Sequence, residues 1–150
     1  METPVKIYTD GGCQGNPGPG GWAYVIVLKT YQGEKILAKN RGSLKETTNN
    51  RMELIAVIEA LKEFRSINDV PDNVTVYTDS QYVQKGISEW IITWKRNNWR
   101  TSDKTAVKNK DLWTELDSLT TDLSIKWEWI RGHSGDKYNE MCDEMTRDSG

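Results

Sequence analysis

The sequence contains one short pattern twice, as Val5-Lys6-Ile7-Tyr8-Thr9-Asp10 and again as Val74-Thr75-Val76-Tyr77-Thr78-Asp79. Both stretches have the alternating, β-branched and aromatic pattern of a strand, and a turn or helix signal follows each of them at once. Their length suits a buried strand better than a helix. Because ligands of open α/β sheets bind outside the carboxyl ends of the strands, we expect Asp10 and Asp79 to lie side by side in a ligand site.

Each aspartate also has a purely structural interpretation. Asp10 precedes Gly11-Gly12 and is a good turn former, while Asp79 could cap the N-terminus of the next helix. For one aspartate alone, neither interpretation would prevail. The repetition of the whole pattern favours a site.

The rest of the chain predicts a single α/β domain over residues 1–150, with the element order βββαβααβα and a mixed five-stranded sheet flanked by helices. A glycine-rich segment follows the first strand and leads into an antiparallel meander. The later elements are strands at 22–28, 34–39, 74–79 and 125–130 and helices starting after 47–50, after 79, at a cap provided by Asn109 and near Asp136. No internal linker or second domain is indicated.

Composition narrows the class of protein. The chain is 36% hydrophobic and 28% charged, which is typical of a globular domain, and no stretch approaches the roughly 18 apolar residues of a membrane span. Its first residues lack the features of a signal peptide. Cys13 and Cys142 have no CxxC spacing, so neither a disulfide framework nor a zinc site is indicated. We expect a cytoplasmic protein without a membrane partner.

Charge is distributed unevenly along the chain. The net charge of −2 argues against a general nucleic-acid binder, yet residues 85–110 contain seven basic side chains and only two acidic ones. A basic block on an acidic body is typical of a surface that docks a polyanion. A run of charge is also commonly just solvated surface, and the charge pattern alone does not decide between these interpretations.

Several motifs occur in one order along the chain. They are Tyr8-Thr9-Asp10-Gly11, Thr47-Thr48-Asn49-Asn50-Arg51-Met52-Glu53, Thr78-Asp79-Ser80-Gln81-Tyr82-Val83, a Trp-rich basic insert, Gly132-His133-Ser134-Gly135 and Asn139-Glu140-Met141-Cys142-Asp143. Together they resemble type 1 ribonucleases H, enzymes that cut the RNA strand of RNA–DNA hybrids. The resemblance runs from about residue 5 to 147 and implies a monomer with the ribonuclease H-like fold, in which three antiparallel strands are followed by two parallel ones.

Carried over by position, the resemblance implies a catalytic group of four metal-binding carboxylates, Asp10, Glu53, Asp79 and Asp143, with His133 on a loop. It implies hydrolysis with two Mg²⁺ ions, with Mn²⁺ as an alternative, leaving 5′-phosphate and 3′-hydroxyl ends. The residue types fit, because converging carboxylates repel one another without a cation and Mg²⁺ prefers oxygen ligands. The alternative for Glu53 is a favourable charge in the first turn of its helix.

The resemblance also implies contacts with an RNA–DNA hybrid duplex. Minor-groove contacts map onto Cys13, Asn16, Asn49, Asn50 and Gln81. A DNA-strand phosphate pocket maps onto Thr48 and Asn109, and a DNA-side channel maps onto Tyr82, Trp90 and Trp94. A substrate-binding handle maps onto the insert at 95–104, with Lys95, Arg96, Trp99 and Arg100. Since Trp90 and Trp94 lie in the apolar stripe of their helix, core packing is an equally good interpretation for them.

Two other functions are compatible with parts of the pattern. Integrases, transposases and resolvases share the implied fold, but they lack the basic insert and the Thr-Thr-Asn-Asn-Arg-Met-Glu helix start. A catalytically inactive hybrid-binding module would be expected to have lost a carboxylate, and all four are present. The chain departs from the family pattern at Met141, where Arg is common, and we expect no additional hybrid-binding domain before the core.

Overall fold

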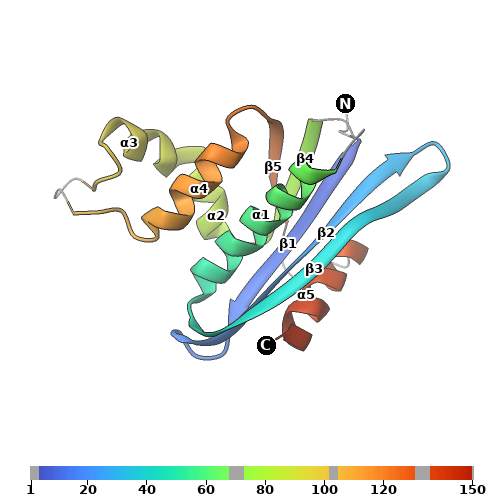
Figure 1. The fold of residues 1–150 in the computed structure, drawn as a ribbon, viewed down its shortest axis with the longest axis horizontal. Helices are drawn as coiled ribbons and strands as arrows, with labels where there is room; N and C mark the ends of the chain where they lie inside the picture. Colours follow the sequence, from blue (N-terminus) through green and yellow to red (C-terminus); the bar gives the residue numbers. More distant parts are fainter. Residues whose placement is uncertain (1–3, 68–72, 102–104, 131–135, 150) are drawn as a thin grey trace.

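A computed structural model describes residues 4–67, 73–101, 105–130 and 136–149 (Figure 1). Five strands form one mixed sheet in the order β3-β2-β1-β4-β5. They are β1 (Val5–Cys13), β2 (Gly18–Thr30), β3 (Gly33–Thr47), β4 (Asn73–Thr78) and β5 (Ser124–Trp129). β1, β2 and β3 are antiparallel neighbours, whereas β4 pairs in parallel with β1 and β5 in parallel with β4. The predicted mixed sheet is therefore confirmed, with β1 at its centre.

The two copies of the repeated pattern pair directly with each other. Val5 lies opposite Val74 and Tyr8 opposite Tyr77 in the parallel register. The two tyrosine rings stack with centroids 4.7 Å apart and planes 7° from parallel. Both strands thus end at the same edge of the sheet, where Asp79 directly follows β4.

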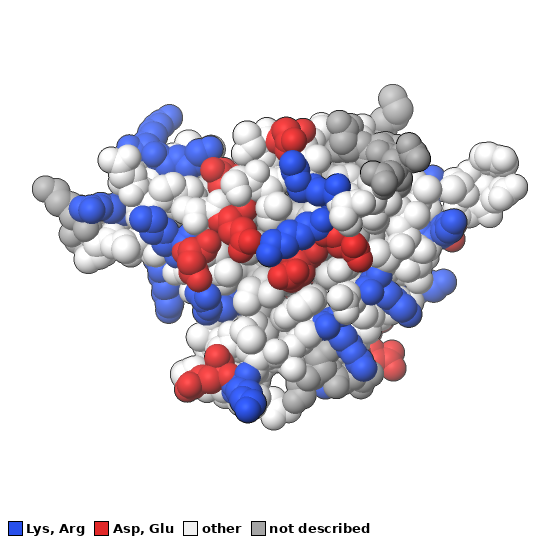
Figure 2. All heavy atoms as spheres, in the orientation of Figure 1, with Lys and Arg blue, Asp and Glu red and all other residues white. Residues whose placement is uncertain are grey.

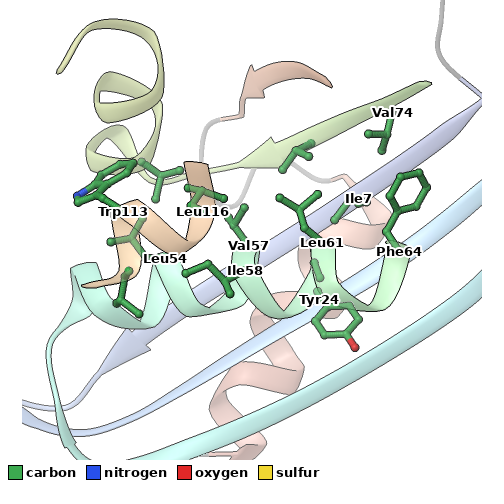
Figure 3. Packing of buried hydrophobic residues seen from close by; sticks show 14 of the residues in the cluster. Ile7, Tyr24, Leu54, Val57, Ile58, Leu61, Phe64, Val74, Trp113 and Leu116 are labelled. Atoms are coloured by element: carbon green, nitrogen blue, oxygen red, sulfur yellow. The ribbon is translucent and has the colours of Figure 1, made fainter. Parts of the chain in front are cut away.

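Helices cover both faces of the sheet (Figure 1). α1 (Asn49–Ser66) and α4 (Lys110–Thr120) lie on one face, and α5 (Lys137–Ser149) lies on the other. Apolar side chains of α1, including Leu54, Val57 and Leu61, are fully buried against the sheet and against Trp113 of α4 (Figure 3). Burial of one such aliphatic side chain contributes about 1.5–3 kcal/mol, so this contact is the main force that fixes α1 on β1.

The β2–β3 hairpin is longer than the predicted strands at 22–28 and 34–39. β3 continues to Thr47 because its backbone stays paired with β2 through two register shifts. Most of its side chains are exposed, so the continuation lacks the apolar alternation from which strands are predicted. β3 forms one edge of the sheet.

The basic segment begins with a helical stretch that is interrupted. α2 (Gln81–Lys85) runs into a π-helical turn, η1 (Gly86–Trp90), and then into α3 (Ile91–Arg96), where one regular helix was predicted. The backbone at Gly86 packs directly against the ring of Trp113 in α4, because a Cβ atom at this position would be 2.1 Å from that ring. In the described ranges of the chain, no helix is both long and apolar enough to cross a membrane.

Candidate active site

Three carboxylates from three different elements meet at the edge where β1 and β4 end. Asp10 belongs to β1 and Glu53 belongs to α1, whereas Asp79 is the residue that directly follows β4. One carboxylate oxygen of each lies within 4.8 Å of the other two. Asp10 and Glu53 are only 7% and 8% exposed, and Asp79 is half-buried. The predicted proximity of Asp10 and Asp79 is thus confirmed, and Glu53 joins them.

Close backbone contact brings Glu53 to this point. A Cβ atom on Gly11 would lie 2.4 Å from the carbonyl carbon of Met52 and 2.7 Å from the backbone nitrogen of Glu53. Only glycine allows β1 and α1 to approach so closely. Glu53 lies beyond the first turn of α1, which holds no acidic residue, so its alternative role as a charge at the helix N-terminus is wrong.

Burial and mutual repulsion dominate the electrostatics of the three groups. Burial, followed by the charges of Asp79 and Asp143, raises the pKa of Asp10 to about 8. Burial, followed by Asp79 and Asp10, raises the pKa of Glu53 well above its usual value. The backbone N–H of Gly11 acts in the opposite direction on both groups. Without a cation the site therefore retains protons at neutral pH.

The donor atoms fit a hard divalent cation. Oε1 of Glu53 is buried and has no hydrogen-bond partner among the residues that the structure describes. An unsatisfied buried carboxylate oxygen is costly, and an oxygen-ligated Mg²⁺ would satisfy it. Asp10, Glu53 and Asp79 are therefore suited to hold such an ion.

Asp143 approaches this group from the other face of the sheet. It lies on α5, close enough to Asp10 to raise its pKa, and both line a cavity of about 400 Å³. One oxygen of Asp143 lies 3.4 Å from a guanidinium nitrogen of Arg147, which lines the same cavity. Arg147 was missed by sequence reasoning, although its i+4 spacing from Asp143 on a helix is the signal that could have found it.

Three of the predicted minor-groove residues form one hydrogen-bonded cluster beside the carboxylates. The backbone N–H of Cys13 donates to Oδ1 of Asn49 at 2.8 Å, and the backbone N–H of Asn49 donates to Oδ1 of Asn16 at 3.1 Å. The glycine-rich segment is thereby fastened to the start of α1. Asn50 follows Asn49 in α1, and Gln81 begins α2 two residues after Asp79.

The predicted channel residues belong to a continuous aromatic cluster. Tyr82 contacts Trp90, and Trp90 contacts Trp94, at centroid distances of 5.7 and 5.8 Å. Trp113, which sequence reasoning missed as part of this group, touches both Tyr82 and Trp94 from α4. Trp90 nevertheless remains 36% exposed. Core packing is therefore confirmed for Trp94, which packs against the main hydrophobic cluster, whereas Trp90 lies at the surface and contacts the rings of Tyr82 and Trp94.

Basic side chains gather where α3 and the following loop project from the body (Figure 2). Arg96 and Arg100 are exposed, and Trp99 packs on Trp94. Lys95 is held by Asp117 of α4 at 3.2 Å, a pairing that was not predicted. His133 and residues 102–104 lie outside the described residues.

Thr48 and Asn109 lie at the starts of α1 and α4. Thr48, within the segment predicted to begin this helix, caps α1 by accepting a hydrogen bond from the backbone N–H of Arg51. Asn109 occupies the N-cap position of α4 as predicted, but its backbone is left-handed (φ 60°) and its side chain makes no capping hydrogen bond. That side chain instead bonds to Arg51 and Tyr82. Sequence reasoning missed Arg51, since nothing in a local pattern shows a contact between distant helices.

Trp129 is a further neighbour of the site that the sequence did not suggest. Its indole Nε1 donates to the backbone carbonyl oxygen of Asp79 at 3.2 Å. The backbone N–H of Ile130 donates to the carbonyl of Thr78 at 2.9 Å. Both bonds tie the end of β5 to the segment that carries Asp79 and so fix its position.

The contact at Gly11 leads to a testable expectation. Gly11→Ala should push α1 away from β1, because the new methyl group would overlap backbone atoms of Met52 that cannot rotate aside. We expect an unfolding free energy lower by about 1–3 kcal/mol, as for other overpacking of a core, together with weaker binding of divalent metal. Urea denaturation and metal titration would measure both. Gly12→Ala is the matched control, since its Cβ would meet only the side chain of Asn49 at 3.6 Å. Equal losses in both variants would contradict the expectation.

Known proteins resemble the chain over almost its whole length. The RNase H family model matches residues 2–149. A ribonuclease H of Treponema denticola is 50% identical over an alignment of 152 positions that covers 95% of this chain and 94% of the relative. The crystal structure of LC9-RNase H1, a type 1 RNase H with the type 2 active-site motif, has a TM-score of 0.85 at 30% identity and covers 99% of this chain and 73% of that one. LC11-RNase H1 in complex with an RNA/DNA hybrid shares the fold, with a TM-score of 0.71 at 24% identity over 97% of this chain and 95% of that one.

Proposed function

The chain belongs to the ribonuclease H family, and we propose that it is an endoribonuclease that hydrolyses the RNA strand of RNA–DNA hybrids with two divalent metal ions. The observation that carries the proposal is the convergence of three carboxylates, from β1, from α1 and from the residue that follows β4, at one sheet edge. The proposed products have 5′-phosphate and 3′-hydroxyl ends. A hybrid as substrate is supported by the LC11 neighbour, which was solved with one.

The carboxylates supply an all-oxygen ligand set. Asp10, Glu53, Asp79 and Asp143 would hold two Mg²⁺ ions, with Mn²⁺ as an alternative. When bound, such ions supply a nucleophile at neutral pH and neutralise charge on the phosphate. Burial of Asp10 and Glu53 excludes bulk water from the carboxylates, and the Gly11 N–H favours their ionised form, which a bound cation requires. His133 is proposed to assist proton transfer or product release, since its ordinary pKa lies near neutrality.

The cluster of Cys13, Asn16 and Asn49 is proposed to recognise the minor groove, together with Asn50 and Gln81. Its hydrogen-bonding groups flank the carboxylates on the glycine-rich side. In the minor groove of a hybrid, 2′-hydroxyl groups distinguish RNA from DNA. These residues would therefore direct the RNA strand to the carboxylates.

The DNA strand is proposed to run along the other side of the site. Thr48 and Asn109 would hold one of its phosphates, and the ring edges of Tyr82, Trp90 and Trp94 would form the wall beside it. The handle, Lys95, Arg96, Trp99 and Arg100, would contact more distant phosphates. For Lys95 this requires exchange of Asp117 for a phosphate, an inexpensive step because exposed ion pairs contribute about 0–1 kcal/mol.

We also propose that the chain forms one domain and works as a monomer in the cytoplasm. Both cysteines are free, as expected in a reducing compartment. Burial raises the pKa of the Cys142 thiol, so this side chain behaves as an apolar core residue between α5 and the sheet.

The test is cleavage of a hybrid whose RNA and DNA strands carry different labels. With Mg²⁺ the RNA strand should be cut to fragments with phosphatase-sensitive 5′ ends, and the DNA strand should stay intact. In EDTA both strands should survive. Duplex DNA of the same sequence is the control substrate and should not be cut. A protein that binds the hybrid tightly in Mg²⁺ but leaves the RNA whole would be a binding module, and the proposal would fail.

A further inference from the structure

Arg51 connects the two residues that are proposed to hold a DNA-strand phosphate. Its backbone N–H donates to Oγ1 of Thr48 at 3.2 Å, and its guanidinium Nη1 donates to Oδ1 of Asn109 at 3.1 Å. The same guanidinium makes a bidentate pair with Asp111, with distances of 3.1 and 2.7 Å. Arg51 therefore lies where the starts of α1 and α4 meet.

The bond from Arg51 determines which way round the amide of Asn109 lies. A guanidinium can only donate, so the amide oxygen must face it and the amide nitrogen must face away. That nitrogen donates to the hydroxyl oxygen of Tyr82 at 3.1 Å, and the same hydroxyl accepts a bond from the indole of Trp113 at 3.0 Å. An amide nitrogen carries two hydrogens, and Tyr82 takes only one of them.

We propose that Arg51 is a positioning residue for DNA-strand recognition, which holds the amide of Asn109 so that it offers an N–H group, and not its oxygen, to a backbone phosphate. This inference rests on the proposed function, because it assumes that Asn109 contacts a phosphate of the hybrid. A phosphate has only acceptor oxygens, so an amide turned by 180° would present like partial charge and be repelled.

The ion pair with Asp111 fixes Arg51 and offsets its charge. Asp111 takes two of the five guanidinium N–H groups and leaves others for Asn109. Because Asp111 neutralises the positive charge of Arg51, the direct electrostatic attraction between Arg51 and a phosphate is weakened. Lysine has the same charge, but its ammonium group has a single nitrogen and no planar fork. It therefore cannot make a bidentate pair with Asp111 and at the same time fix the orientation of the Asn109 amide.

The chain offers a matched control at the other end of the same two helices. Arg65 of α1 makes a bidentate pair with Asp122, just after α4, at 2.6 and 3.2 Å. The two arginine side chains are similarly exposed, 33% for Arg51 and 37% for Arg65. Arg65 contacts none of the proposed substrate-binding residues through these bonds. If Arg51 only joined two helices, it would behave like Arg65.

The experiment compares Arg51→Lys with Arg65→Lys in steady-state cleavage of the hybrid and in thermal melting. Both variants should melt at similar temperatures. Arg51→Lys should raise KM about five- to tenfold, the effect of one ordinary hydrogen bond, and leave kcat within about twofold. Arg65→Lys should change neither. Equal KM values for the two variants would overturn the proposal.

A double-mutant cycle separates positioning from direct contact. In an Asn109→Ala background, Arg51→Lys should cause no further rise in KM, because no amide is left to orient. A rise as large as in the wild-type background would overturn the proposal and mean that Arg51 binds phosphate itself. Failure of the proposed function would look different, because the wild-type protein would not cleave the hybrid at all.

Discussion

Asp79→Asn should slow hydrolysis of a hybrid by at least about a thousandfold and leave hybrid affinity within about threefold of wild type. The substitution keeps the size of the side chain but removes the charge from one of three carboxylates whose oxygens lie within 4.8 Å of one another. A thousandfold loss corresponds to about 4 kcal/mol in the activation barrier, as expected when a metal ligand loses its charge. Single-turnover cleavage and equilibrium binding in EDTA would measure the two quantities.

Asp122→Asn is the control for this prediction. It makes the same chemical change in an exposed carboxylate that pairs with Arg65, so turnover should match that of wild type. If Asp79→Asn cleaved within about tenfold of wild type, a barrier change of only about 1.4 kcal/mol, Asp79 would not be a metal ligand.

The second large effect concerns stability without metal. Asp10→Asn should raise the free energy of unfolding in EDTA at pH 8 by about 2–4 kcal/mol, because it removes a buried charge that Asp79 and Asp143 repel. Burial and these two charges raise the pKa of Asp10 to about 8 in the folded protein, whereas its ordinary value is 3.8. Asparagine has a similar shape and carries no charge, so this penalty disappears. The variant should be inactive with Mg²⁺.

The pH dependence follows from the same shift. Between about pH 4 and pH 8 the folded protein holds a proton on Asp10 that the unfolded chain has lost, so wild-type stability falls as pH rises through this range. The stability gap between Asp10→Asn and wild type should therefore be small near pH 4, widen towards pH 8 and then level off. Glu53 has a raised pKa as well, so part of the decline should remain in the variant.

Urea denaturation at several pH values, with EDTA and with Mg²⁺, would check this prediction. Mg²⁺ should stabilise wild type more than the variant, because the ion binds only the folded carboxylate site. The carboxylates would not repel one another as described if the gap were independent of pH, or if Mg²⁺ stabilised both proteins equally.

Much of the sheet could be predicted because its central pair is encoded locally and twice. The patterns ending at Asp10 and Asp79 each predict a strand, and their likeness predicts that both strands end at one edge. The extension of β3 to Thr47 could not be predicted in this way, because it depends on backbone pairing with β2 and not on its own exposed side chains. The π-helical turn at Gly86 was equally hidden, since it accompanies a contact with Trp113.

In the candidate site, too, some residues could be predicted from the sequence, whereas contacts that depend on packing could not. Asp10 and Asp79 follow from strand patterns, and Glu53 and Asp143 follow from the resemblance. Gly11 could be predicted as a turn residue, but its role in bringing β1 and α1 together depends on atoms of Met52, far away in the sequence. The bond between Arg51 and Asn109 likewise joins residues 58 positions apart. Contacts of this kind exist only once the helices have packed.

The outer edge of β3 affects whether two copies of the chain can associate through their sheets. A strand at the edge of a sheet exposes backbone groups that can pair with the same edge of another copy. Between its two register shifts β3 is regular from Ala38 to Leu44, and if two copies paired antiparallel about Asn40, Lys39 of each copy would face Arg41 of the other. Like charges directly opposite each other in a sheet destabilise it by about 0.2–1 kcal/mol per pair. The basic side chains on either side of Asn40 would thus repel their counterparts in this arrangement, which disfavours pairing of two copies through the middle of β3.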